Sequence, residues 1–207
     1  MAEFVLDAGL LQVMSPCLCA AVDRKNQETT YLPKFQPEYF SNFVEWLNTK
    51  QIESLSASIR RKEVNRSWWF TLAKTYTLAN RLHVLDLGNY LIHLAAQPMK
   101  LQNREEYDRP GRDTIREVYE SCHEESGLRR LIVAMEAYSA PLDMAGDRKG
   151  WETIVDSYAQ EFVIDVTLMQ HKISWGGVDN PFLVQNFEEQ FYDNPSYLVG
   201  LKTQVHL

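Results

Sequence analysis

The sequence predicts an α+β protein, in which a small sheet is flanked by a cluster of helices and followed by an all-helical C-terminal region. Two short segments near the N-terminus predict the sheet: EFVL at residues 3–6 can form a strand, and TTYLP at 29–33 is rich in residues that favour strands. The helices are predicted by apolar residues that recur at intervals of three and four from residue 37 onward.

The first helices follow from local pattern. Residues 10–22, LLQVMSPCLCAAV, are apolar enough for a buried helix, with Pro16 near its start or at a kink. In QPEYFSNFVEWLNTKQI, residues 36–52, Pro37 suits a first helical turn. The apolar residues of this stretch lie at i, i+3, i+4 and i+7, which places them on one helix face: Phe40, Phe43, Val44 and Leu47. We expect most of this face in the core.

Polar segments separate the remaining predicted helices. RRKEVNR at 60–66 predicts a solvent-exposed loop, and Ser67 can cap a helix over 68–82. A shorter helix over 85–96 ends before Pro98. Residues 98–113 contain two prolines and a glycine, and they predict a connector between a domain at 1–97 and a helical region at 114–207. Within that region Asp113 and Ser126 can cap two helices, and residues 151–171 supply one or two more.

Composition excludes several classes of protein. The 207 residues are 45% hydrophobic and 24% charged, which is typical of a globular chain. The formal net charge of −7 disfavours general nucleic-acid binding. No run of 18 apolar residues predicts a membrane span, and the first residues have no basic region typical of a signal peptide. Three cysteines without a framework spacing favour a reducing compartment, so we expect the cytoplasm, the nucleus or both.

No motif predicts catalysis or metal binding. Cys17 and Cys19 have a poor spacing for a zinc site, and Cys122 is far away in the sequence. The chain has no G-x-S-x-G motif beside its histidines and no glycine-rich phosphate loop. The basic run at 60–66 could be a nuclear import patch or an anion contact, although a soluble loop is the favoured interpretation. We therefore expect a protein that is not an enzyme and has no cofactor.

Three segments, in this order and separation, resemble a BTB/POZ domain. They are FVLDAGLLQVMSPCLCAAV at 4–22, TTYLPKFQPEYFSNFVEWLNTKQI at 29–52 and LAKTYTLANRLHVLDLGNYLIHLA at 72–95. The second resembles the family's strand and turn, followed by a helix that closes with an exit similar to W-L-Y-T-G-x-I. In addition, IREVYESCHEESGLRRLIVAM at 115–135 resembles a segment that follows the domain in many fungal BTB proteins. The resemblance implies the small sheet flanked by helices.

The chain departs from the family pattern near its start. The family has a strand before the position of Phe4, so we expect an N-terminally truncated domain that lacks this strand. Asp7 stands where family members commonly have a histidine. Family dimers often use the missing N-terminal elements, so the resemblance leaves the oligomeric state open.

The resemblance implies an intracellular, non-catalytic protein–protein interaction module, either a homo-oligomeric scaffold or a cullin ubiquitin-ligase adaptor. The implied partners are another BTB chain or a cullin, and not nucleic acid or a membrane. Because the family can contact partners around the exit of the aromatic helix, the predicted contact residues are Glu45, Lys50, Gln51 and Ile52. The alternative is a helical enzyme or small-ligand-binding protein, which would need polar groups converging in an apolar cavity.

Overall fold

The computed structural model describes residues 36–100, 109–139, 158–175, 181–183 and 187–193, together with residues 4, 6, 9, 12 and 15. Of this part of the chain, 78% is helical. The helices are α3 (Pro37–Thr49), α4 (Glu53–Arg60), α5 (Arg66–Arg81), α6 (Leu85–Lys100), α7 (Arg112–Ser121), α8 (Gly127–Ser139) and α10 (Gln160–Ser174), with the 3₁₀ turns η2 (Pro181–Leu183) and η3 (Phe187–Phe191).

The prediction of an α+β fold is wrong, because the described residues contain helices and no strand or sheet. Phe4 and Leu6 belong to the first predicted strand, yet both pack against the helical core instead. The ring of Phe4 lies 5.0 Å from that of Phe40 in an edge-to-face arrangement. Burial against a helix therefore accounts for the apolar character of these two residues. The second predicted strand, at 29–33, lies outside the described residues.

The aromatic helix α3 confirms the helix predicted within 36–52, although Val44 of its predicted face is only half-buried. Pro37 occupies its first turn, and its buried face contains Phe40, Phe43, Trp46 and Leu47. Three other predicted boundaries are wrong. Asp113 does not cap α7, because the helix already begins at Arg112 and its N-cap residue is Gly111. The cap of α5 is Asn65 and not Ser67, since the Asn65 side chain accepts a hydrogen bond from the backbone N–H of Trp68 at 3.0 Å. Helix α6 also continues through Pro98 to Lys100, where proline removes one hydrogen bond from the last turn only.

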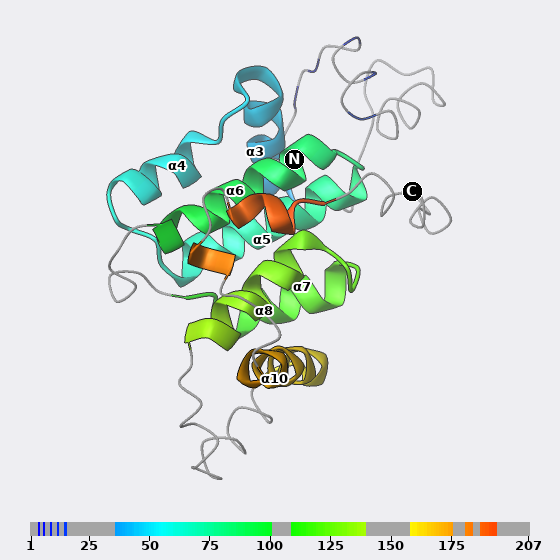
Figure 1. The fold of residues 1–207 in the computed structure, drawn as a ribbon. Coiled ribbons are helices and arrows are strands. Elements are labelled where there is room, and N and C mark those ends of the chain that lie inside the picture. The colour runs from blue at the N-terminus through cyan, green and yellow to red at the C-terminus, as the bar shows by residue number, and fades with distance from the viewer. Residues whose placement is uncertain are drawn as a thin grey trace.

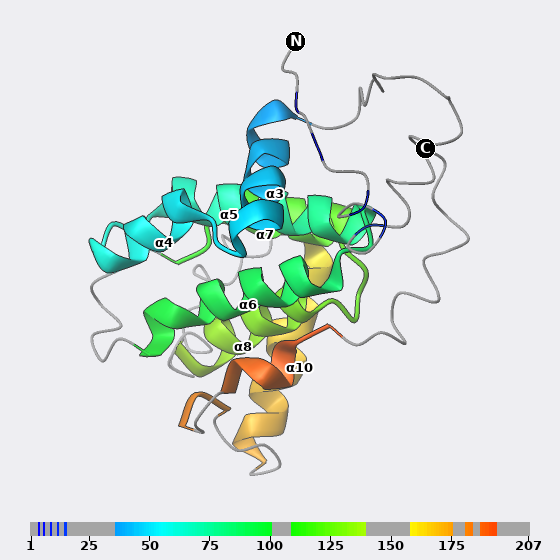
Figure 2. The same ribbon diagram turned by 90° about the horizontal axis from the view of Figure 1, so that it is seen from above.

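The helices form successive layers around one core. Figure 1 shows α3 to α6 in one part of the molecule, α7 and α8 beneath them, and α10 outermost. Helix α5 packs against α3, α6 and α7, and α8 packs against α10. Figure 2, seen from above, shows that α5 overlies α7 and α6 overlies α8, and that α3 crosses α5. One cluster of buried hydrophobic residues includes members of every helix from α3 to α10 and of η3.

The 3₁₀ turn η3 packs against α6 and α8, and buried hydrogen bonds join Asp193, which follows it, to α5 and α8. The hydroxyl of Tyr76 donates to Oδ2 of Asp193 at 2.5 Å, and the backbone N–H of Gly127 donates to Oδ1 at 2.7 Å. Gly127 must lack a side chain here, because a Cβ would lie 1.8 Å from the carbonyl oxygen of Phe191. These contacts bring the C-terminal part of the described chain onto the helices that precede it by more than sixty residues.

In the part of the chain that the structure describes, none of the helices has the length and apolarity that a membrane crossing requires.

Candidate functional site

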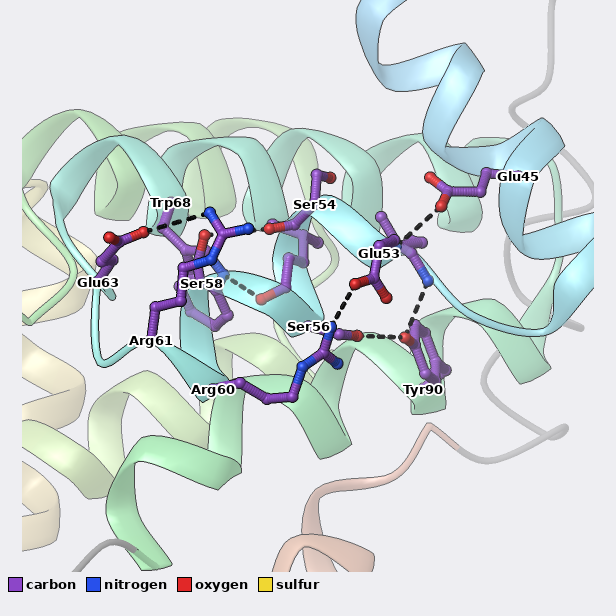
Figure 3. Close-up of polar contacts among 12 residues, drawn as sticks. Glu45, Glu53, Ser54, Ser56, Ser58, Arg60, Arg61, Glu63, Trp68 and Tyr90 are labelled. Atoms are coloured by element: carbon purple, nitrogen blue, oxygen red, sulfur yellow. Dashed lines mark hydrogen bonds and ion pairs between the residues drawn. The ribbon is translucent and has the colours of Figure 1, made fainter.

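The exit of α3 is the first candidate surface, because the sequence places its predicted contact residues there. Ile52 is 0% exposed, and its backbone N–H donates to the hydroxyl of Tyr90 at 3.0 Å. The same hydroxyl lies 3.2 Å from Oγ of Ser56, as Figure 3 shows. Ile52 is therefore an anchor that fixes the exit to α6, and it presents no side chain to a partner.

Glu45 has a structural task at this exit. Its Oε1 accepts a hydrogen bond from the backbone N–H of Glu53 at 2.9 Å, which satisfies a free donor at the start of α4 (Figure 3). The N-cap residue Ile52 has no side-chain oxygen for this purpose. A carboxylate near a helix N-terminus is also favoured by the helix dipole. Glu45 thus joins α3 to α4 while staying half-buried.

Lys50 and Gln51 are the two predicted contact residues that remain exposed. Lys50 ends α3 in a left-handed conformation with φ of 58°, and its N–H donates to the Trp46 carbonyl at 2.7 Å. Its Nζ lies 4.2 Å from the centroid of the Trp46 ring, within the range of a cation–π contact. The hydroxyl of Thr49 accepts the N–H of Gln51 at 3.1 Å. The exit is therefore an exposed segment with a fixed backbone.

The basic run that follows does not form a concentrated anion site. Figure 3 shows that Arg60 forms an ion pair with Glu53 and Arg61 with Glu63. Nη1 of Arg61 lies 3.8 Å from Oε2 of Glu63. Lys62 forms the left-handed turn after α4, with φ of 58°. Acidic neighbours thus offset part of the charge, and exposed pairs of this kind contribute little to stability.

The reactive side chains in the described part of the chain have structural roles. Burial raises the pKa of Cys122 to about 12, which keeps it a neutral thiol, and its Sγ lies 3.8 Å from the hydroxyl of Thr77. Nε2 of His93 lies 2.8 Å from Nε2 of Gln97, and Nδ1 of His93 lies 3.1 Å from Oε1 of the buried Glu188. His123 accepts the backbone N–H of Glu125 at 3.2 Å.

The described ranges contain no group of residues that could hold a metal ion, and a pocket found in them has a mostly polar lining. Within them no three His, Cys, Asp or Glu residues are grouped so that they could hold a metal ion. Cys17 and Cys19 lie outside these ranges. A pocket of about 180 Å³ lies between α3, α5 and α7, and its lining is mostly polar. The Lys74–Glu117 ion pair, at 2.6 Å, occupies its wall. This lining differs from the apolar cavity that the small-ligand alternative requires.

The second candidate surface is the outer face of α10, which the sequence analysis did not identify. Its Ile164, Leu168 and Trp175 are 48%, 55% and 79% exposed, and they are the exposed large hydrophobic residues of the described chain. The opposite face buries Phe162 and Val166. The sequence does carry a signal, because the apolar residues of this helix follow two separate stripes, one with Phe162 and Val166 and one with Ile164 and Leu168.

Comparisons with protein families, with curated proteins and with solved structures found no match for this chain. The BTB/POZ resemblance therefore stays a prediction.

Proposed function

We propose that this chain is a non-catalytic protein–protein interaction module of the BTB/POZ type, with the exit of α3 as a contact surface. One observation carries the proposal: Lys50 and Gln51 are exposed on a backbone whose neighbours, Trp46 and Ile52, are buried. A segment that is already ordered loses little conformational entropy when a partner binds it.

The character of the surface suits protein recognition. Lys50 supplies a charge held over an aromatic ring, Gln51 supplies an amide, and Glu53 adds an exposed carboxylate. Such groups give a polar rim that can select a partner by hydrogen bonding and charge. In the resembled family, the surface around this helix and its exit can contact a partner, including a cullin. A cullin or a second BTB chain is the partner we propose.

The non-catalytic part of the proposal is supported by how the reactive groups are used. The Cys122 thiol is buried and its pKa is raised, which disfavours the thiolate that a nucleophile needs. The ring nitrogens of His93 are both within hydrogen-bond distance of other side chains. These groups stabilise helix packing at their positions.

A binding titration with purified cullin N-terminal regions and purified BTB domains tests the proposal. We expect the intact chain to bind one of the tested cullins or BTB domains with a dissociation constant in the micromolar range. Lys50→Glu combined with Gln51→Ala should weaken this binding about tenfold or more, which corresponds to about 1.4 kcal/mol. Both side chains are exposed, so the unfolding temperature of the variant should change little.

Arg116→Glu provides the matched control, because Arg116 is exposed on α7 and the substitution makes the same change of charge. It should leave binding unchanged. Failure of the intact chain to bind any tested cullin or BTB domain would contradict the proposal. Equal weakening by both variants would show that net charge, and not the α3 exit, governs the contact.

A further inference from the structure

We infer that α10 is a self-association helix, through which two copies of this chain pair in antiparallel orientation. The exposed face of α10 has the spacing of a coiled-coil seam. Residues Glu161, Ile164, Leu168, His171 and Trp175 follow one another at intervals of three, four, three and four. All five are exposed in the structure. We call them the α10 seam.

The fold holds this seam outward. Phe162 and Val166 bury the other side of α10 against the core, where α10 packs on α8 and α7. Arg129 of α8 adds ion pairs at 3.2 Å to Glu161 and 3.4 Å to Asp165. Figures 1 and 2 show α10 at the outer edge of the helical layers. The helix is thus positioned on its own molecule before any second copy arrives, which lowers the entropic cost of pairing.

The sequence of the seam favours a second copy as the occupant. In an antiparallel pair with a two-fold axis, Ile164 faces the partner's Trp175, and Leu168 faces the partner's His171. Each apolar side chain then covers a ring or an alkyl group of the other copy. His171 and Trp175 already lie with ring centroids 5.1 Å apart, so they present one continuous aromatic surface.

Charge selects the antiparallel orientation. The first turn of α10 carries Glu161, and its last turn carries His171 and Lys172. Antiparallel packing brings the acidic end of one helix near the basic end of the other and opposes the two helix dipoles. In the same register, Asp165 lies near the partner's Lys172 on the flank of the seam. Parallel packing would instead place like charges together.

The size of the seam predicts a reversible dimer. The helix has 15 residues, so it is about 22 Å long. One helix pair of that length buries less than the roughly 1,200 Å² of a stable interface. We therefore expect a dissociation constant of the dimer in the micromolar range.

Sedimentation velocity of the full chain, across a concentration series from low to high micromolar, tests the inference. The mass should rise from that of a monomer toward that of a dimer. Leu168→Lys should weaken dimerisation at least about tenfold, because it places a charge opposite the partner's His171. Thr167→Lys is the matched control: it adds the same charge at an exposed position of α10 outside the seam and should leave the dimer intact. Trp175→Ser provides a second seam variant should Leu168→Lys fold poorly.

Cysteine crosslinking determines the orientation. In the antiparallel register, a mixture of Ile164→Cys and Trp175→Cys chains should form a mixed disulfide under oxidation. Wild-type chains treated in the same way measure the background from native cysteines. A chain that stays monomeric throughout the series, or equal behaviour of Leu168→Lys and Thr167→Lys, would overturn the inference. Disulfides within Ile164→Cys chains alone would overturn the antiparallel orientation.

Discussion

The environment of Asp193 differs from that of an ordinary surface carboxylate. It is buried, and its two oxygens accept from Tyr76 and Gly127. Burial raises the pKa of Asp193 above its ordinary value of 3.8, while these hydrogen bonds and the charge of Arg130 act in the opposite direction. The sequence alone could not predict this site, since 117 residues separate Tyr76 from Asp193.

The raised pKa of Asp193 predicts a specific pH dependence of stability. Between 3.8 and the higher native value, the folded protein retains a proton that the unfolded chain has released. The free energy of unfolding from this group therefore falls as pH rises through that window. Asp193→Asn should reduce this fall, because an amide does not titrate. The variant should still fold, since the amide oxygen can accept from Gly127 and the amide nitrogen can donate to Tyr76. Urea unfolding at a series of pH values measures the effect.

Asp113→Asn is the control for Asp193→Asn, because the Asp113 side chain is 84% exposed. It should leave the pH dependence close to that of the wild-type chain. Parallel curves of stability against pH for Asp193→Asn and the wild-type chain would show that Asp193 titrates at the same pH in both states, contrary to the prediction.

At the scale of elements, local pattern predicts helices whose apolar face is strong and misses those that depend on neighbours. Helix α3 was predicted from its own spacing of Phe40, Phe43 and Leu47. Helix α4 was not predicted, because most of its eight residues are polar. Other helices supply the contacts that hold α4. They bury Leu55, and Nε1 of Trp68 donates to the Leu55 carbonyl at 3.0 Å. Glu45 of α3 caps the start of α4. The cap that Glu45 provides for α4 therefore could not be predicted from the local sequence of α4.

The buried cation Arg129 contributes to the attachment of α10. The Arg129 side chain is 7% exposed, and its guanidinium carbon lies 3.9 Å from the centroid of the Tyr119 ring. Arg129→Lys keeps the charge but loses the planar group that pairs with Glu161 and Asp165 together. We expect a loss of about 1.5–3 kcal/mol, the range of a hydrogen bond to a charged group. Hydrogen exchange should become faster in α10 while α5 is unaffected.

Arg116→Lys, at an exposed position of α7, serves as the comparison for Arg129→Lys. Its exchange profile should match that of the wild-type chain. Uniformly faster exchange in every helix of Arg129→Lys would show that the guanidinium supports the whole core and not the attachment of α10 in particular.

For the whole molecule, sequence reasoning predicted the helical character after residue 37 but not the arrangement of its parts. The α+β prediction is wrong because apolar residues of a short extended segment, such as Phe4 and Leu6, can be buried against helices without a strand partner. The α10 seam was missed because apolar spacing does not say which of two stripes the core uses. Side chains from both sides of the predicted connector at 98–113 meet in the structure, including Tyr76 with Asp193 and Lys74 with Glu117.

These contacts predict that α5 and α8 unfold together. Leu131 of α8 is 0% exposed, and Leu131→Ala should lower the free energy of unfolding by about 2–5 kcal/mol through the cavity it leaves. Because α5 and α8 contribute to one core cluster, native-state hydrogen exchange should show the same decrease for the most protected amides of both helices. Thr167→Ala, at an exposed position of α10 outside the seam, is the control and should change neither. A decrease confined to α7, α8 and α10 would instead establish the two-part organisation that the polar stretch at 98–113 predicts.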